Sequence, residues 1–342
     1  MLTGINSEED LEQVLARPSS RDIEFASNLK GDVLILGAGG KMGPTLARRV
    51  AAAFAAAGGS NRTYAVSRFS DSKQVERLTS FGIGAIQADL WDKPQLAALP
   101  ESPNILYLVG TKFGTQGDEA GTWGTNTFLP GLVAARFPDS RMVALSTGNI
   151  YPLVCLESGG SKEGDAASPV GEYAQSCLGR ERILEYFSRL NATPMTMVRL
   201  NYAVEGRYGV LLDIGRRVFN QQPIQLAMGY FNLIWQGDAN SCAFRSLGLA
   251  ESPPRILNLT GPDIVSVRET ALAFGDRFSL PVRFEGEERP TSFLSDTSLC
   301  TQELGAPEVR LEQLIELTTN WIVRGRKTLE KPTHFQVRDG RF

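Results

Sequence analysis

A glycine-rich turn between an apolar segment and a helix-forming segment constrains the fold of this chain more than any other feature. Residues 33–36 are all apolar, as in a short buried strand, and an alanine-rich segment begins after Pro44. A turn that joins a strand to a helix presents backbone N–H groups and the positive end of the helix dipole to an anion. The sequence therefore predicts a site for the pyrophosphate of a dinucleotide. The residues expected to contact it are Gly37, Gly40, Lys41, Met42 and Gly43.

Strand-like and helix-like segments alternate after this turn. The expected strands are residues 33–37, 63–67, 84–88, 104–110, 141–147 and 195–200, followed later by 255–259. The expected helices are residues 43–57, 71–81, 122–137 and 173–190, followed later by 266–278 and 311–323. Such alternation is typical of a parallel sheet with crossover helices. The sequence predicts an α/β fold: a Rossmann-type doubly wound parallel sheet with a smaller, discontinuous C-terminal substrate part.

The same pattern predicts how the chain is divided. We expect residues 1–29 to form an N-terminal leader that is helical in part. A dinucleotide-binding domain is expected at residues 30–200, with residues 235–280 returning to it in part. The substrate-binding part then comprises residues 201–234 and 281–342. A cleft between the two parts is the expected binding site.

Composition excludes several classes of function. A net charge of −3 argues against a nucleic-acid or anionic-membrane partner, which need a concentrated positive surface. No apolar run approaches the ~20 residues of a membrane span, and the polar N-terminus predicts a cytoplasmic protein. His334 is the one histidine and the four cysteines lack metal-type spacing, so neither a metal site nor a Ser-His-Asp triad is expected. The expected partner is a small-molecule substrate.

The end of the second expected strand bears on the choice of dinucleotide. An acidic residue at this position would bind the adenosine ribose, whereas an arginine accommodates a 2′-phosphate. The chain has Ser67 and Arg68 here and no acid before Asp71. Arg68 is equally compatible with a solvated loop residue, so both NAD and NADP stay open, with NADP favoured. Further cofactor contacts are expected at Asp89, Leu90 and Gly110.

Several later segments point to a known family. Ser-Thr-Gly-Asn-Ile-Tyr-Pro begins at Ser146, and Tyr-Ala-Gln-Ser-Cys-Leu-Gly-Arg-Glu begins at Tyr173. A Thr-Asn pair ending at Asn126 precedes them, and Arg-Leu-Asn-Tyr follows from Arg199. In order and spacing these segments and the glycine turn resemble the extended short-chain dehydrogenase/reductase family, the group of NAD-dependent epimerases and dehydratases. The resemblance covers roughly residues 32–325.

The resemblance implies an enzyme that oxidises a carbinol of a sugar, nucleotide-sugar or related polyol. By it, Tyr173 would be the catalytic acid/base, Thr147 would bind the same substrate oxygen, and Asn126 would support them. A phenol in this role must be activated from a reference pKa of ~10. The family also implies a homodimer formed through the helices at 122–137 and 173–190. Substrate contacts are expected at Asn201 and Arg289.

One residue departs from the family pattern. Cys177 stands four residues after Tyr173, where the family has a lysine that binds the nicotinamide ribose and lowers the tyrosine pKa. A neutral thiol is a weak donor without charge, so it serves neither purpose well. Arg180 or Lys112 could supply the charge instead, and Cys177 could be a nucleophile or a passive thiol. Two hypotheses therefore stay open: an active enzyme, or a dinucleotide-binding sensor or scaffold that has lost catalysis.

Other polar residues are candidates for ligand contacts. Arginines can clamp a carboxylate or phosphate in bidentate fashion. Arg289 is preferred because the family often has a diphosphate-binding arginine in this region. A polar loop at residues 114–119 is also expected near the ligand. The other arginines considered are Arg199, Arg207, Arg216 and Arg217.

Overall fold

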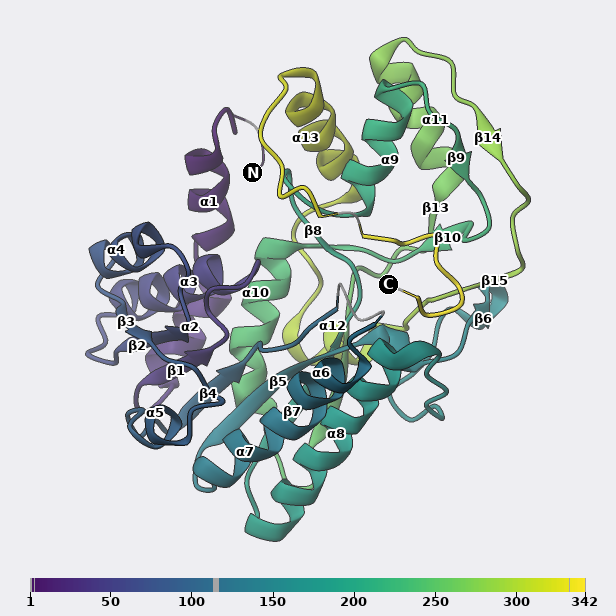
Figure 1. Ribbon diagram of the computed structural model, residues 1–342. Helices are drawn as coiled ribbons and strands as arrows, with labels where there is room; N and C mark the ends of the chain where they lie inside the picture. Colours follow the sequence, from purple (N-terminus) through teal and green to yellow (C-terminus); the bar gives the residue numbers. More distant parts are fainter. Residues whose placement is uncertain (1, 3, 113–116, 332, 342) are drawn as a thin grey trace.

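The computed structural model describes residue 2 and residues 4–112, 117–331 and 333–341. Its centre is a seven-stranded sheet in the order β12-β7-β5-β4-β1-β2-β3, and every neighbouring pair is parallel (Figure 1). The predicted doubly wound α/β fold is confirmed. The strands are β1 Val33–Leu36, β2 Thr63–Ser67, β3 Gly84–Gln87, β4 Asn104–Tyr107, β5 Arg141–Thr147, β7 Met195–Leu200 and β12 Arg255–Leu259.

The fourth strand is shorter than predicted. A strand was expected over residues 104–110, but β4 ends at Tyr107. Beyond it, the backbone N–H of Thr111 donates to the side chain of Asn126 at 2.8 Å, and Asn126 Nδ2 donates back to the Thr111 carbonyl at 2.9 Å. A side chain therefore replaces the neighbouring strand as hydrogen-bond partner, and the chain leaves the sheet toward the binding region.

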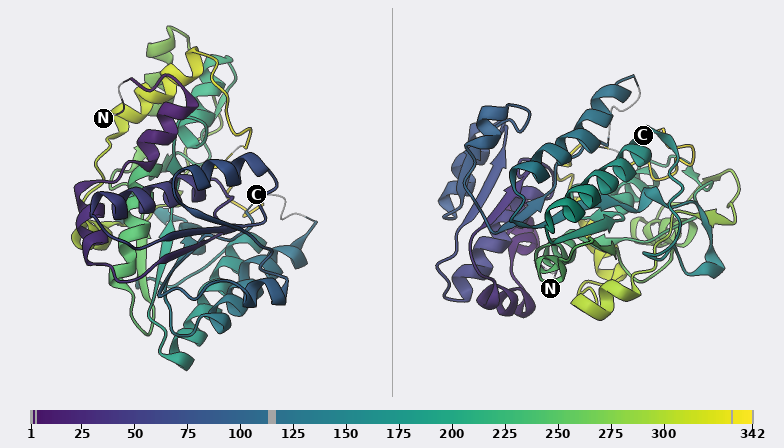
Figure 2. Two further views of the ribbon diagram at one scale, coloured as in Figure 1. Left: turned by 90° about the vertical axis from the view of Figure 1, so that its left-hand side faces the viewer. Right: turned by 90° about the horizontal axis from the view of Figure 1, so that it is seen from below.

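Helices cover both faces of the sheet (Figures 1 and 2). The helix predicted at 122–137 is a continuous helical run from 119 to 136, whose middle stretch, η1 Gly124–Phe128, is π-helical. The apolar residues of α3 and α10 pack on one face, and those of α7 and α8 pack on the other. The helices of this part are α3 Gly43–Ala56, α4 Ser72–Ser80, α5 Lys93–Ala97, α6 Glu119–Trp123, α7 Leu129–Arg136, α8 Gly171–Asn191, α10 Gln236–Arg245 and α12 Ser298–Leu304.

The C-terminal part has its own apolar core. Helices α9 Val210–Phe219, α11 Val267–Phe278 and α13 Leu311–Val323 pack together around it. The described residues also form four two-stranded pairs: β8 Ala203–Val204 with β11 Ile234–Trp235, β9 Ile224–Gln225 with β14 Phe284–Glu285, β10 Tyr230–Phe231 with β13 Val265–Ser266, and β6 Val154–Cys155 with β15 Thr291–Ser292. Short 3₁₀ helices connect the elements at η2 Gly148–Ile150, η3 Leu156–Ser158 and η4 Ser246–Leu249.

The first residues, expected as a leader, pack into the fold. They form α1 Glu8–Ala16, as expected in part, and α2 Ser20–Asn28. Asp22 is fully buried, forms an ion pair with Arg49 at 2.8 Å and accepts a hydrogen bond from Ser241 at 2.6 Å. Both helices contact α3 and α10. Within the described ranges, no helix is long and apolar enough to cross a membrane.

Candidate functional site

Two adjoining cavities lie at the carboxyl ends of the central strands. One, of about 290 Å³, is lined by residues that follow β1, β4, β5 and β7, together with parts of α8 and the C-terminal part. The other, of about 270 Å³, is lined by residues that follow β2 and β3. Both include Gly37, Gly40, Leu108 and Gly110. The strand order reverses between β1 and β4, which is where open α/β sheets bind their ligands.

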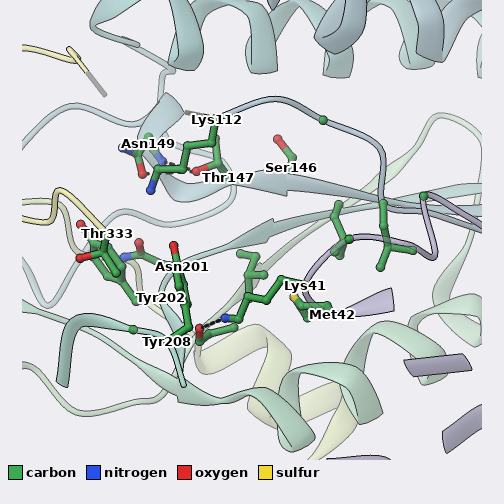
Figure 3. A pocket seen from close by; sticks show the side chains of 18 of the residues that line it. Lys41, Met42, Lys112, Ser146, Thr147, Asn149, Asn201, Tyr202, Tyr208 and Thr333 are labelled. Atoms are coloured by element: carbon green, nitrogen blue, oxygen red, sulfur yellow. Dashed lines mark hydrogen bonds between the residues drawn. The ribbon is translucent and has the colours of Figure 1, made fainter. Parts of the chain in front are cut away.

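The glycine turn forms the floor between the cavities. All five residues expected to contact the pyrophosphate line the larger cavity, and Gly37 has a φ of +85° that suits a glycine. Lys41 reaches across that cavity: its Nζ donates to the carbonyl of Ala203 at 2.6 Å and lies 4.0 Å from the ring centroid of Tyr208 (Figure 3). Burial lowers the pKa of Lys41 to about 7. An anion bound here would restore the charge on this lysine.

The smaller cavity contains the residues expected around the adenosine. Ser67, Arg68, Asp89 and Leu90 all line it. Arg68 is exposed, so its guanidinium is accessible to a ligand. Asp71 is used elsewhere, since its carboxylate caps α4 by accepting from the backbone N–H of Lys73 at 3.0 Å. The described lining of this cavity therefore offers a cation and a serine where an NAD-selective fold has an acid.

Tyr173 and Thr147 meet in the larger cavity, as the family resemblance implies. Tyr173 lies in the first turn of α8, and Thr147 is the last residue of β5. Burial raises the pKa of Tyr173 well above its usual value, and a hydrogen bond with Thr147 and the charge of Arg180 act in the opposite direction. The pair brings a phenol and a hydroxyl to one place, where both can contact a single substrate oxygen.

Asn149 is a site residue that was not predicted. It lies two residues beyond Thr147, whose Oγ1 donates to Asn149 Oδ1 at 3.3 Å. Asn149 is only 4% exposed and lines the larger cavity, yet its Nδ2 has no hydrogen-bond partner in the structure. A buried amide donor without a partner is costly, so its presence in a cavity points to a ligand acceptor. The available sequence signals were its position just past a strand's carboxyl end and its place in the Ser-Thr-Gly-Asn motif that begins at Ser146.

Cys177 lies behind the cavity rather than in it. It is 1% exposed and packs in a small apolar cluster with Ile150 and Tyr151. It does not line the larger cavity, although Tyr173 from the same helix does. Burial raises the pKa of the Cys177 thiol, so the thiol stays protonated. This placement favours a passive thiol over a nucleophile.

The two cations considered as replacements for the lysine both lie near Tyr173. Arg180 is buried: it donates to Asn126 Oδ1 at 2.8 Å and to the carbonyl of Leu145 at 2.7 Å. Its Nη2 also lies 2.6 Å from the position that a Cβ would take at Gly110, directly below the floor of both cavities.

Lys112 is the second cation, and it lies inside the larger cavity. Its Nζ is 5.8 Å from the ring centroid of Tyr173 and 5.8 Å from that of Tyr202. Burial lowers the pKa of Lys112 to about 8. Figure 3 shows Lys112 beside Thr147 and Asn149 on one side of the cavity. Tyr202, Tyr208 and Thr333 lie on the other side.

The remaining candidates are divided between the site and the scaffold. Asn201 lines the larger cavity as expected, but Arg289 is exposed and lines neither of the two cavities. Arg199 is held by Glu181 at 2.7 Å, so it supports the fold rather than facing a ligand. Of the polar loop predicted at 114–119, residues 114–116 lie outside the described residues. Arg207 and Arg216 are likewise in ion pairs, with Glu205 and Glu330.

No protein-family model matches the sequence, and no curated protein matches it. Solved structures do match it in three dimensions. UDP-glucuronic acid 4-epimerase from Bacillus cereus, with UDP-glucuronic acid and NAD, superposes with a TM-score of 0.69 at 14% identity, over 86% of this chain and 99% of that one. dTDP-glucose 4,6-dehydratase from Streptomyces venezuelae, bound to NAD, gives 0.72 at 16%, over 86% and 97%.

A third match is an epimerase from Methanothermobacter thermautotrophicus, with a TM-score of 0.70 at 17% identity, over 90% of this chain and 96% of that one. The chain has the fold of the extended short-chain epimerases and dehydratases. The family resemblance drawn from the motifs is thus confirmed for the fold. The alignment with this epimerase includes 90% of this chain and 96% of the other, so the shared fold comprises both the seven-stranded sheet and the C-terminal part.

Proposed function

We propose that this protein is an NAD(P)-dependent enzyme that oxidises a hydroxyl-bearing carbon of a sugar, nucleotide-sugar or related polyol, as an oxidoreductase, epimerase or dehydratase. The observation that carries the proposal is the shared cavity of the glycine turn, Tyr173 and Thr147. Structures of the same fold are bound to NAD, which supports a dinucleotide as cofactor. Fold alone does not specify the reaction, which depends on the side chains of the site.

The chain's own residues fit a bound dinucleotide. The turn from Gly37 to Gly43 and the start of α3 would hold its pyrophosphate, and the smaller cavity would hold its adenosine. The cofactor would supply a hydride acceptor. Thr147 would orient the substrate hydroxyl by a hydrogen bond, and Tyr173 would accept its proton. Asn126 would hold the loop after β4, through its two hydrogen bonds to Thr111, and so shape the cofactor face of the cavity.

We further propose that NADP is preferred over NAD. Arg68 is exposed at the edge of the smaller cavity, where a 2′-phosphate would gain a charge-assisted hydrogen bond. Removing the guanidinium in Arg68→Ala should lower the affinity for NADPH about tenfold and leave that for NADH within about twofold. Equal losses of affinity for NADPH and NADH would contradict the proposed preference for NADP.

A titration of the purified protein with NADPH and NADH, followed by nicotinamide fluorescence, tests the cofactor directly. A preparation freed of co-purified nucleotide is needed. Saturable binding of either form supports the enzyme and justifies a substrate screen. Absence of binding for both would overturn the proposal. Once a substrate is found, Tyr173→Phe should abolish its turnover while leaving dinucleotide binding intact.

The second candidate function is a dinucleotide-binding sensor or scaffold. Cys177 at the position of the family's lysine favours it. This candidate predicts tight dinucleotide binding without turnover of any hydroxyl substrate. The intact pair of Tyr173 and Thr147 in one cavity favours the enzyme, since binding alone does not require them.

We propose a homodimer formed through α7 and α8. An apolar groove of about 460 Å³ runs between these helices and η1, and large apolar side chains along them are exposed. Phe128 is 59% exposed, and Trp123 lines the same groove. Light scattering should report a dimer for the parent chain and a monomer for Phe128→Glu. A monomeric parent would remove this proposal.

We also propose that the enzyme works in the cytoplasm on a small molecule, without a nucleic-acid or membrane partner. Its four cysteines are free thiols, as is usual in a reducing compartment. Its net charge of −3 supplies no concentrated positive surface for polyanions. Fractionation of the source cells would test the compartment.

A further inference from the structure

The charged side chains in the described lining of the larger cavity are all positive. Among the described residues that line it there are two lysines, Lys41 and Lys112, and no aspartate or glutamate. The carboxylate whose charge reaches Lys112 is Asp213, and this group accepts two hydrogen bonds from Thr333, at 2.8 and 2.5 Å. A cavity with buried ammonium groups and no carboxylate in its described lining attracts an anion.

The two lysines serve different ends of the cavity. Lys41 belongs to the glycine turn, where the proposed cofactor pyrophosphate lies. Lys112 follows β4 and lies 5.8 Å from the ring centroid of Tyr173, which bonds Thr147. Lys112 therefore belongs to the end of the cavity where a substrate would react (Figure 3).

Asn149 adds a directional donor at the same end. Its Oδ1 accepts from Thr147, and its Nδ2 has no partner in the structure although the residue is almost fully buried. A ligand oxygen would satisfy this donor. A carboxylate has two acceptor oxygens, so one can face Lys112 while the other accepts from Asn149.

The C-terminal segment limits how far a ligand can extend. Residues 327–331 and 333–341 cross from α13 past α9 toward the start of α8, and Thr333 lines the cavity (Figures 1 and 3). Asp213 of α9 anchors one end through Thr333. At the other end, the carbonyl oxygen of Gly340 lies only 2.4 Å from the position that a Cβ would take at Gly171, two residues before Tyr173.

Arg338 anchors the middle of this segment. Its guanidinium donates to the carbonyl and the hydroxyl of Thr291, both at 2.6 Å, and to the carbonyl of Ala227 at 3.0 Å. The segment is thus tied to the C-terminal part as well as to both sides of the cavity. A volume of about 290 Å³ is just below the ~300–1,000 Å³ typical of ligand pockets. The nicotinamide end of a cofactor would fill part of it, which leaves room for a small substrate.

We infer that the substrate is a small hydroxylated carboxylate, such as a sugar acid, and not a nucleoside diphosphate sugar. Its carboxylate lies between Lys112 and the amide of Asn149, and its reacting hydroxyl faces Thr147 and Tyr173. This inference rests on the proposed function and narrows its substrate class. It assigns Lys112 and Asn149 as substrate-binding residues.

Matched pairs of ligands test the inference on the full chain saturated with the dinucleotide that binds it. The pairs are gluconate with sorbitol and galacturonate with galactose, and UDP-glucose and UDP-glucuronate are the nucleotide-sugar probes. Isothermal titration should show at least one acid binding about tenfold or more tightly than its neutral partner, and neither nucleotide-sugar binding. Stronger binding of a neutral sugar or of a UDP-sugar overturns the inference.

Variants locate the carboxylate. Lys112→Met should weaken binding of the acid about tenfold or more and leave the neutral partner within about twofold, and Asn149→Ala should act in the same direction. Lys93→Met, which changes an exposed lysine of α5, is the matched control and should change neither. Equal acid affinity in Lys112→Met overturns the assignment. Nicotinamide fluorescence distinguishes failure of this inference from failure of the proposed function. If the parent chain binds NAD(P)H but none of the acids, this inference alone is wrong. If the parent chain does not bind NAD(P)H, the proposed function is wrong.

Discussion

Arg180 Nη2 donates a hydrogen bond of 2.8 Å to Oδ1 of Asn126, and the same amide holds the backbone of Thr111 through two further hydrogen bonds. A buried cation on α8 is therefore tied to the loop that follows β4, beside the floor of both cavities. The charge of Arg180 lowers the pKa of Tyr173 against the effect of burial. The helix thus supplies a cation near the phenol from a position three residues after Cys177.

Replacing Arg180 by methionine should affect both stability and the pH profile. The carbonyl of Leu145 and the amide of Asn126 would lose buried partners, which costs about 2–4 kcal/mol in the free energy of unfolding. Without the guanidinium the Tyr173 pKa rises further. Because Tyr173 must be deprotonated to act as the base, the acidic limb of the kcat/KM profile should move to higher pH. Urea unfolding and a pH–rate profile on the identified substrate measure the two effects.

The conservative variant Arg180→Lys separates charge from packing. It should return the acidic limb toward that of the parent, because the cation is present again, while recovering only part of the lost stability. A pH profile that is the same in the parent and in both variants would show that Arg180 has a structural role alone.

Introducing the family's lysine in Cys177→Lys should not raise activity. The side chain at 177 is 1% exposed, packs with Ile150 and Tyr151, and lies near the charge of Arg180. An ammonium placed there is buried beside a like charge, which should lower the free energy of unfolding by roughly 3 kcal/mol or more. Cys177→Ala is the control and should cost less, since it only removes volume. Turnover that rises sharply in a stably folded Cys177→Lys variant would contradict the arrangement described here.

Lys41 should make stability depend on pH in a predictable direction. Its folded-state pKa of about 7 lies below the ordinary 10.5, because burial disfavours the ammonium. Above pH 10.5 Lys41 is neutral in both states and does not lower the free energy of unfolding. As the pH falls from 10.5 to 7, the unfolded chain binds a proton that the folded chain does not, so the free energy of unfolding decreases. Lys41→Met should be more stable than the parent at pH 6, on the order of 2–4 kcal/mol after allowing for the lost hydrogen bond to Ala203, and little different near pH 10.

Urea unfolding at both pH values measures the Lys41 effect, and Lys93→Met again serves as control. The same variant should bind NAD(P)H more weakly, since Lys41 faces the proposed pyrophosphate site. A stability difference of equal size at pH 6 and pH 10 would show that the lysine charge is not its source.

Asp22 should be essential for the packing of the N-terminal helices. Its carboxylate is fully buried with Arg49 and Arg245 and accepts a hydrogen bond from Ser241. Asp22→Ala leaves two arginines beside an empty site, so the free energy of unfolding should fall by about 3–5 kcal/mol. Glu24→Ala, on the exposed side of the same helix, is the matched control. Equal urea midpoints for the two variants would contradict this role.

Local pattern was sufficient to predict the sheet and the cofactor turn. The bounds of β5 at 141–147, β7 at 195–200 and β12 at 255–259 agree with the prediction, because apolar runs of strand length are buried on both faces of a parallel sheet. The glycine turn follows from three spaced glycines between a strand and a helix. Motif resemblance implied that Tyr173 and Thr147 act together, and both line the larger cavity.

Tertiary packing decided everything that depends on contacts between distant segments. The end of β4 at Tyr107 depends on Asn126, and the unpartnered amide of Asn149 is visible only in the folded cavity. The placement of both Lys112 and Arg180 near Tyr173 brings together a loop and a helix that are far apart in the chain. Thr333, which was not predicted, lines the larger cavity, whereas Arg289 does not. Sequence periodicity encodes which face of an element is buried, but the partners of a buried charge are chosen by how the elements pack.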